Sequence, residues 1–274
     1  MVVYRYINAL SLDVVAGALI CSLFFAKLFQ TRLPFVVLIT LGLAVWSVYT
    51  LDHLWDASRS LAPTVSFRHH FHARYQLPLK VMLILTITAG MILFWYLPLS
   101  TRKLGVFLTL VILAYFLTIH WWKNNPLYHK EALVAVVYGG GVMLGPYSLK
   151  EVDIALPHLL IAGQFILLAF CNLLVFAYFE TESDNQQNFG SISGSIGKWR
   201  TKTLIIISLL VVNAGSVAGY FLNSGITGTM QGQIILALMT IPLGVVLAWP
   251  DFFKKKERYR FLGDLAFFIP LLAL

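Results

Sequence analysis

Long apolar stretches recur along almost the whole chain, and they constrain its fold more than any other feature of the sequence. A helix that crosses a bilayer needs roughly 20 mostly apolar residues. Nine stretches meet or approach this length, over residues 8–29, 34–51, 78–98, 104–121, 131–149, 154–179, 202–223, 231–249 and 259–274. We therefore expect an all-α, polytopic membrane protein whose nine transmembrane helices form a single bundle.

The composition supports a membrane protein and excludes several other classes. Hydrophobic residues make up 59% of the 274 residues, and charged residues only 12%, whereas soluble domains carry about 25% charged residues. A disordered chain, a small disulfide scaffold and an ordinary soluble enzyme are all excluded by these values. Residues 1–274 are expected to form one transmembrane domain.

The distribution of basic residues predicts the orientation. With the N-terminus in the cytoplasm, 15 of the 20 Lys and Arg residues fall on the cytoplasmic side, as the positive-inside rule requires. We therefore expect an integral protein of the inner (cytoplasmic) membrane. The net charge of +8 is explained by basic residues in the cytoplasmic loops, which contact anionic lipid headgroups. Membrane lipids are thus the expected partners, and no motif points to nucleic acid.

Two short acidic stretches stand at the ends of the second and sixth apolar stretches. Each contains two acids four residues apart, Asp52 with Asp56 and Glu180 with Asp184, and this spacing places both carboxylates on one helix face. Both stretches run towards the cytoplasm in the predicted topology. The offset between the two pairs is 128 residues, which suggests a four-helix unit used twice, roughly over 8–121 and 131–249, followed by a last helix over 259–274.

Four carboxylates at one membrane surface would repel each other unless a cation or water compensates them. Mg²⁺ is typically held by one or two carboxylates together with substrate phosphates and water. Two facing acid pairs could therefore bind a diphosphate through Mg²⁺. The alternative is that these acids are solvated helix ends that never meet, but the repeated spacing on one side of the membrane favours a joint site.

The acidic stretches resemble the two aspartate-rich motifs of the UbiA superfamily of intramembrane prenyltransferases. The first family motif is commonly Asn-Asp-x-x-Asp-x-x-x-Asp, and the chain has Val48-Tyr49-x-x-Asp52-x-x-x-Asp56 in that frame. The second is commonly Asp-x-x-x-Asp, and the chain has Glu180-x-x-x-Asp184. The last two acids of the first motif match, while its leading Asn-Asp is replaced by Val-Tyr.

The resemblance implies a UbiA-like fold and a Mg²⁺-dependent transfer of an isoprenyl group from isoprenyl diphosphate to an aromatic or lipid-like acceptor. It also implies that Mg²⁺ is held by Asp52, Asp56, Glu180 and Asp184. The family tends to carry a lysine after the fourth helix, where this chain has Lys123, which would bind the diphosphate and stabilise the leaving group.

Other polar residues are candidates for the same site. Arg59 and Arg68 suit a diphosphate because the guanidinium binds phosphate in a bidentate manner. Lys130 is a further cationic candidate, and Asn172 stands two helical turns before Glu180, so it could face the same cavity. Asp13 lies within the first apolar stretch and could act as the base that activates the acceptor.

Three other functions remain open from the sequence. The altered first motif is compatible with a UbiA-like terpene cyclase or with a non-catalytic relative. A transporter or lipid-binding membrane protein is the other class, but a transporter site is expected near the bilayer midplane, whereas the acid pairs lie at one surface.

Overall fold

The structure, a computed structural model, describes residues 2–59, 67–121, 130–187, 190–221 and 228–274, which are almost entirely helical and contain no strand. The predicted all-α class is therefore confirmed. The elements are α1 (Val2–Ala9), α2 (Leu12–Leu28), α3 (Phe35–Arg59), α4 (Phe67–Arg74), α5 (Gln76–Phe94), α6 (Leu99–Trp121), α7 (Lys130–Ser148), α8 (Leu156–Gln187), α9 (Ile192–Ile196), α10 (Lys198–Phe221), α11 (Thr229–Ala248), α12 (Pro250–Lys254), the 3₁₀ turn η1 (Lys255–Glu257), α13 (Arg258–Leu265) and the 3₁₀ segment η2 (Ala266–Ala273).

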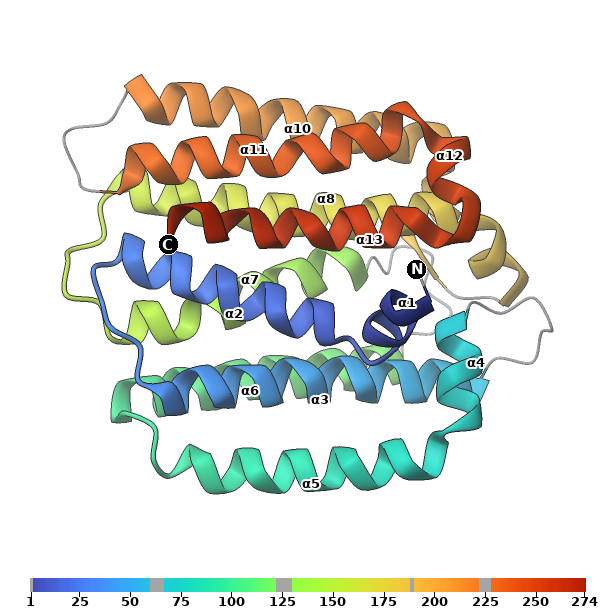
Figure 1. The fold of residues 1–274 in the computed structure, drawn as a ribbon, viewed down its shortest axis with the longest axis horizontal. Helices are drawn as coiled ribbons and strands as arrows, with labels where there is room; N and C mark the ends of the chain where they lie inside the picture. Colours follow the sequence, from blue (N-terminus) through green and yellow to red (C-terminus); the bar gives the residue numbers. More distant parts are fainter. Residues whose placement is uncertain (1, 60–66, 122–129, 188–189, 222–227) are drawn as a thin grey trace.

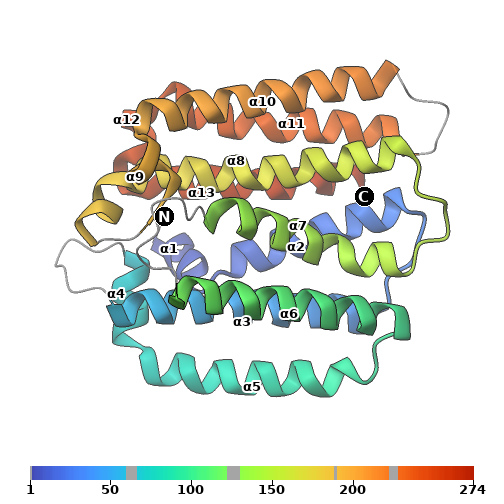
Figure 2. The same ribbon diagram turned by 180° about the vertical axis from the view of Figure 1, so that it is seen from behind.

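The long helices run side by side along one axis of the molecule (Figure 1). Helices α8, α10, α11 and α13 lie on one side, α2 and α7 in the middle, and α3, α5 and α6 on the other side, in both views (Figures 1 and 2). The short helices α1, α4, α9 and α12 gather at one end of the bundle. This end is where the polar side chains described below come together.

Each of the nine predicted stretches falls on one of the long helical segments, the ninth on α13 with η2. Among the described residues, α3, α5, α8, α10 and α11 contain segments long and apolar enough to cross a membrane. A sixth span is present if α1 and α2, which meet at a bend of 71°, count as one. The chain is thus an integral membrane protein, and the count of nine spans stays a prediction.

The acid pairs lie within helices rather than beyond their ends. Helix α3 continues to Arg59 and α8 to Gln187, eight residues past the predicted ends at 51 and 179. The predicted boundaries followed the loss of apolar residues, but a helix continues through polar residues once its apolar part is packed. Both acid pairs therefore have the helical spacing that the sequence suggested.

The main core is formed by α2, α7, α8, α10, α11 and η2, with Phe25 and Phe165 fully buried at its centre. A glycine lets α7 approach α8, because a Cβ at Gly139 would lie 2.6 Å from Cγ1 of Ile166. Helix α5 packs on α3 through a smaller apolar cluster. The opposite side of α5 exposes many large apolar side chains, as expected of a lipid-facing helix.

Candidate functional site

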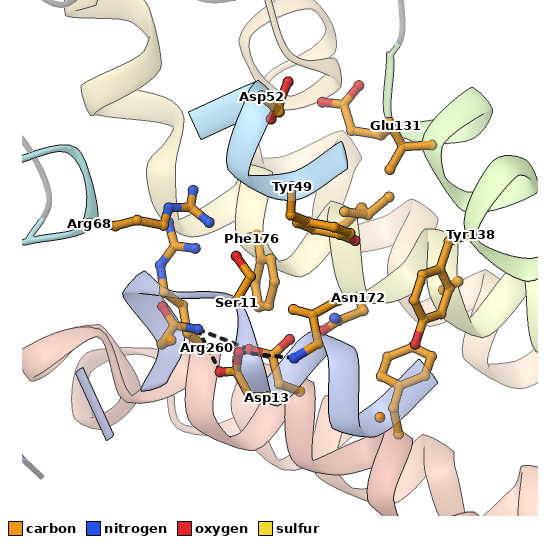
Figure 3. Close-up of a pocket in the computed structure, with 18 of the residues that line it drawn as sticks. Ser11, Asp13, Tyr49, Asp52, Arg68, Glu131, Tyr138, Asn172, Phe176 and Arg260 are labelled. Atoms are coloured by element: carbon orange, nitrogen blue, oxygen red, sulfur yellow. Dashed lines mark hydrogen bonds between the residues drawn. The ribbon is translucent and has the colours of Figure 1, made fainter. Parts of the chain in front are cut away.

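A cavity of about 190 Å³ opens between the helices and is lined from almost every layer of the bundle. Its walls come from α1, α2, α3, α4, α7, α8, α13 and η2, together with Ser191 just before α9 (Figure 3). The short helices thus contribute to the same space as the long ones.

The residues that line each wall recur along the sequence with helical spacing. On α8, the lining residues follow the three-to-four spacing of one helix face: Ala169, Asn172, Leu173, Phe176, Ala177 and Glu180. On α3, Tyr49, Asp52 and His53 occupy one face in the same way. The α8 face thus runs from Ala169 to the acid Glu180.

Glu180 is held by neighbours from α13. Its Oε1 accepts hydrogen bonds from the Tyr259 hydroxyl at 3.0 Å and from Nη2 of Arg260, with which it forms an ion pair. The Tyr259 ring also stacks on Phe179, with centroids 4.5 Å apart. Arg260 is only 3% exposed, so this pair places a buried positive charge on the cavity wall.

A second polar cluster joins α1, α2 and α13. The Nδ2 of Asn8 donates to Oδ2 of Asp13 at 2.8 Å and to Oδ2 of Asp264 at 3.2 Å. The Tyr4 hydroxyl donates to the same Asp264 oxygen at 3.4 Å. Two buried carboxylates are therefore bridged by one amide, and both line the cavity.

Asp52 and Glu131 lie at the other end of the cavity in Figure 3, and their carboxylates point toward one another. The part of the wall between the two ends is mainly apolar and aromatic. Tyr138 and Phe267 meet edge to face, with centroids 5.6 Å apart, and Phe176 carries the Arg260 guanidinium over its ring. The cavity thus joins acidic, basic and aromatic surfaces.

Two buried histidines lie next to each other at the cavity, and His53 is the one that lines it. The rings of His53 and His72 are 5.0 Å apart, and Nδ1 of His72 donates to the carbonyl oxygen of Arg68 at 2.9 Å. Burial lowers the pKa of the His72 imidazole below its ordinary value of 6.5. The hydrogen bond to the Arg68 carbonyl opposes this shift, and the positive charge of Arg68 adds to it. His72 therefore favours its neutral form.

The structure brings five of the predicted site residues to this one cavity: Asp13, Asp52, Arg68, Asn172 and Glu180. Four others lie in described helices, but their side chains are outside the described part of the chain: Asp56, Arg59, Lys130 and Asp184. Lys123 lies outside the described residues altogether.

Sequence reasoning missed Glu131, Arg260 and Asp264 as lining residues. Arg260 resembled a positive-inside loop residue, because it follows Lys254, Lys255, Lys256 and Arg258. The available signal was its spacing of four residues from Asp264, which places both side chains on one face of an otherwise apolar segment. Glu131 gave no such signal. Its neighbours in the chain do not show that its side chain contacts the start of α9.

No known protein-family model matches the sequence, and neither does any curated protein. Solved structures do match. The apo structure of a UbiA homologue from Aeropyrum pernix K1 has a TM-score of 0.67 at 15% identity, over 94% of this chain and 95% of that one. This chain has the UbiA fold.

Two structures of a UbiA homologue from Archaeoglobus fulgidus share the fold. One is bound to DMAPP and Mg²⁺, with a TM-score of 0.62, and the other to GPP and Mg²⁺, with a TM-score of 0.65. Each is 10% identical to this chain, with 98% of both chains covered. The predicted resemblance is therefore confirmed at the level of the fold, across nearly the whole chain.

Proposed function

We propose that the protein is a UbiA-superfamily prenyltransferase, which transfers an isoprenyl group from its diphosphate to an acceptor within the membrane. The observation that carries the proposal is the cavity, which joins carboxylates, arginines and an aromatic wall within a UbiA fold. The prenyl diphosphates DMAPP and GPP, found with Mg²⁺ in homologues of this fold, support the substrate class.

The described residues fit a Mg²⁺ ion that binds together with the diphosphate. No group of three His, Cys, Asp or Glu side chains in the described ranges could hold a metal by itself. Mg²⁺ commonly takes one or two carboxylates and completes its shell with phosphate oxygens and water. Asp52 lines the cavity as one such carboxylate, and Asp56, Glu180 and Asp184 complete the proposed set. When bound, the ion would neutralise charge on the leaving diphosphate.

The basic residues would hold and stabilise the diphosphate. Arg68 from α4 and Arg260 from α13 both reach the cavity, on the same side of it (Figure 3). Guanidinium groups can donate two parallel hydrogen bonds to phosphate oxygens. The ion pair with Glu180 keeps Arg260 in place. Further positive charge is proposed to come from Lys123, Arg59 and Lys130. Asn172, which lines the cavity, is proposed to donate from its amide.

The apolar wall would accept the prenyl chain. As the bond between the allylic carbon and the diphosphate oxygen breaks, the diphosphate leaves with the electron pair and positive charge develops on carbon. The ring faces of Tyr138, Phe176 and Phe267 can stabilise such a charge. Asp13 is proposed to take the proton of the attacking acceptor, because its carboxylate lines the same cavity.

The proposed setting is the inner membrane, with the N-terminus and the polar end of the cavity on the cytoplasmic side. Support comes from the short helices α1, α4, α9 and α12, which gather at one end of the bundle. Arg5, Arg68 and Lys256 line a small depression between α1, α4 and η1. Basic residues at one end of a membrane bundle are typical of its cytoplasmic side.

The proposal is tested by incubating the detergent-purified full chain with radiolabelled GPP, Mg²⁺ and a panel of aromatic and lipid acceptors. We expect release of diphosphate that depends on Mg²⁺, and labelled product with the correct acceptor. Asp52→Asn should abolish both. Absence of diphosphate release from a well-folded wild-type chain with every acceptor would contradict the proposal.

A further inference from the structure

The Glu131 carboxylate, in the first turn of α7, has two oxygens in different surroundings. Oε1 accepts a hydrogen bond from the backbone N–H of Ile192 at 2.8 Å, at the start of α9. Oε2 is buried and has no hydrogen-bond partner among the described residues. The residue is only 5% exposed and lines the cavity. One oxygen therefore has a structural role, and the other is buried without a partner in a residue that lines the cavity.

A buried carboxylate oxygen without a partner is costly to keep. A buried acceptor that is left unsatisfied destabilises the fold, and a charged one does so more strongly. No ion pair joins Glu131 to a lysine or arginine side chain that the structure describes. An ionised Glu131 would therefore be stabilised by a cation bound in the cavity.

Asp52, which is half-buried, lies at the same end of the cavity as Glu131. It forms no ion pair with any described side chain, and its carboxylate points toward that of Glu131 (Figure 3). Glu180, in contrast, already binds Arg260 and Tyr259. Of these three acids, Asp52 and Glu131 are thus the two that form no ion pair with a described cationic side chain.

We propose that Glu131 is a ligand of a divalent cation that it shares with Asp52, and that this cation holds the diphosphate. The inference rests on the proposed function and changes its metal site: α7 supplies a carboxylate, while Glu180 positions Arg260. Two carboxylates with phosphate oxygens and water make an ordinary Mg²⁺ shell. Because Oε1 of the same side chain binds the start of α9, the cation also fixes the segment that carries Ser191.

The test is binding of Mn²⁺ to the full chain in detergent, with inorganic diphosphate and no prenyl substrate, followed by the electron paramagnetic resonance of free Mn²⁺. Glu131→Gln keeps the side-chain volume and an oxygen for the Ile192 N–H but removes the charge. We expect it to weaken Mn²⁺ binding at least about tenfold, since even outer-shell changes cost 10–100-fold. Asp52→Asn should act similarly.

The matched control is Glu182→Gln, which removes an exposed acid already paired with Lys198 and Lys254. It should leave Mn²⁺ affinity within about twofold. Wild-type affinity in a folded Glu131→Gln protein would overturn the proposal. If wild-type protein binds Mn²⁺ through Glu131 but never transfers a prenyl group, the metal site stands and the proposed function fails.

A second measurement needs no variant that might fail to fold. Fe²⁺ with ascorbate and peroxide cleaves a protein backbone close to a bound metal, and the fragments of wild-type protein identify the ligands. We expect cleavage near residues 52 and 131, suppressed by excess Mg²⁺. Cleavage near residues 52 and 180 without any near 131 would overturn the assignment.

Discussion

Removal of the charge on Glu180 should destabilise the fold as well as alter the site. Glu180 forms its ion pair with Arg260, whose side chain is only 4% exposed. Glu180→Gln keeps the volume and an acceptor for Tyr259 but leaves the guanidinium without its main counter-charge. The variant therefore tests whether the buried pair positions Arg260.

The magnitude follows from the surroundings of the pair. Removal of one partner from a buried ion pair costs about 3–5 kcal/mol. The Glu180 side chain is 25% exposed, and Glu257 lies 3.6 Å from Nε of Arg260, so solvent and this second acid offset part of the loss. We expect a decrease of about 3 kcal/mol in the free energy of unfolding.

Unfolding by SDS in mixed micelles, followed by far-ultraviolet circular dichroism, measures this change. The control is Glu182→Gln, whose side chain is 64% exposed and binds Lys198 and Lys254; such surface pairs contribute about 0–1 kcal/mol. The double variant Glu180→Gln/Arg260→Gln should recover most of the loss, because no unpaired charge stays buried. Equal stability of Glu180→Gln and Glu182→Gln would refute the reasoning.

Three further predictions concern other parts of the fold. Gly139→Ala should destabilise the chain by about 1–3 kcal/mol in the same SDS assay, because its Cβ would meet a side-chain carbon of α8 at 2.6 Å; Gly140→Ala, with its nearest neighbour at 4.0 Å, is the control and should be near neutral. Asn8→Ala should cost about 1–3 kcal/mol, because the two carboxylates that the amide bridges lose a donor; an unchanged unfolding midpoint would argue against that bridge. Since burial lowers the pKa of His72 below 6.5, unfolding binds protons, so its contribution is present above that value and is lost as the pH falls below it. Thermal unfolding between about pH 7 and 5 should show this loss, and His72→Asn should reduce it; an identical pH dependence in the variant would contradict the assignment.

The sequence predicted the helices of this fold because hydropathy alone marks apolar segments of bilayer length. All nine stretches lie on helical segments. The spacing of Asp52 with Asp56 and of Glu180 with Asp184 correctly placed each pair in a helix. These features depend only on residues close in sequence, so they can be read without a matching family model.

The cavity depends on which helices pack against one another. Contacts between residues far apart in the sequence cannot be read from local sequence patterns. Glu131 contacts the start of α9, 61 residues away, and Arg260 contacts Glu180, 80 residues away. The two basic residues Lys254 and Arg260 look alike in a count of charges, yet one binds an exposed acid and the other is buried. Only packing distinguishes a membrane-surface charge from a charge in the site.

We propose that this protein of UbiA fold binds an isoprenyl diphosphate through Mg²⁺ at the cavity. The most direct measurement is binding of a non-hydrolysable isoprenyl diphosphate analogue to the detergent-purified full chain, with Mg²⁺ and with EDTA, alongside Asp52→Asn. We expect saturable binding with Mg²⁺ that is lost in EDTA and in the variant. Binding of equal strength in EDTA, or none by the folded wild-type chain, would contradict the account.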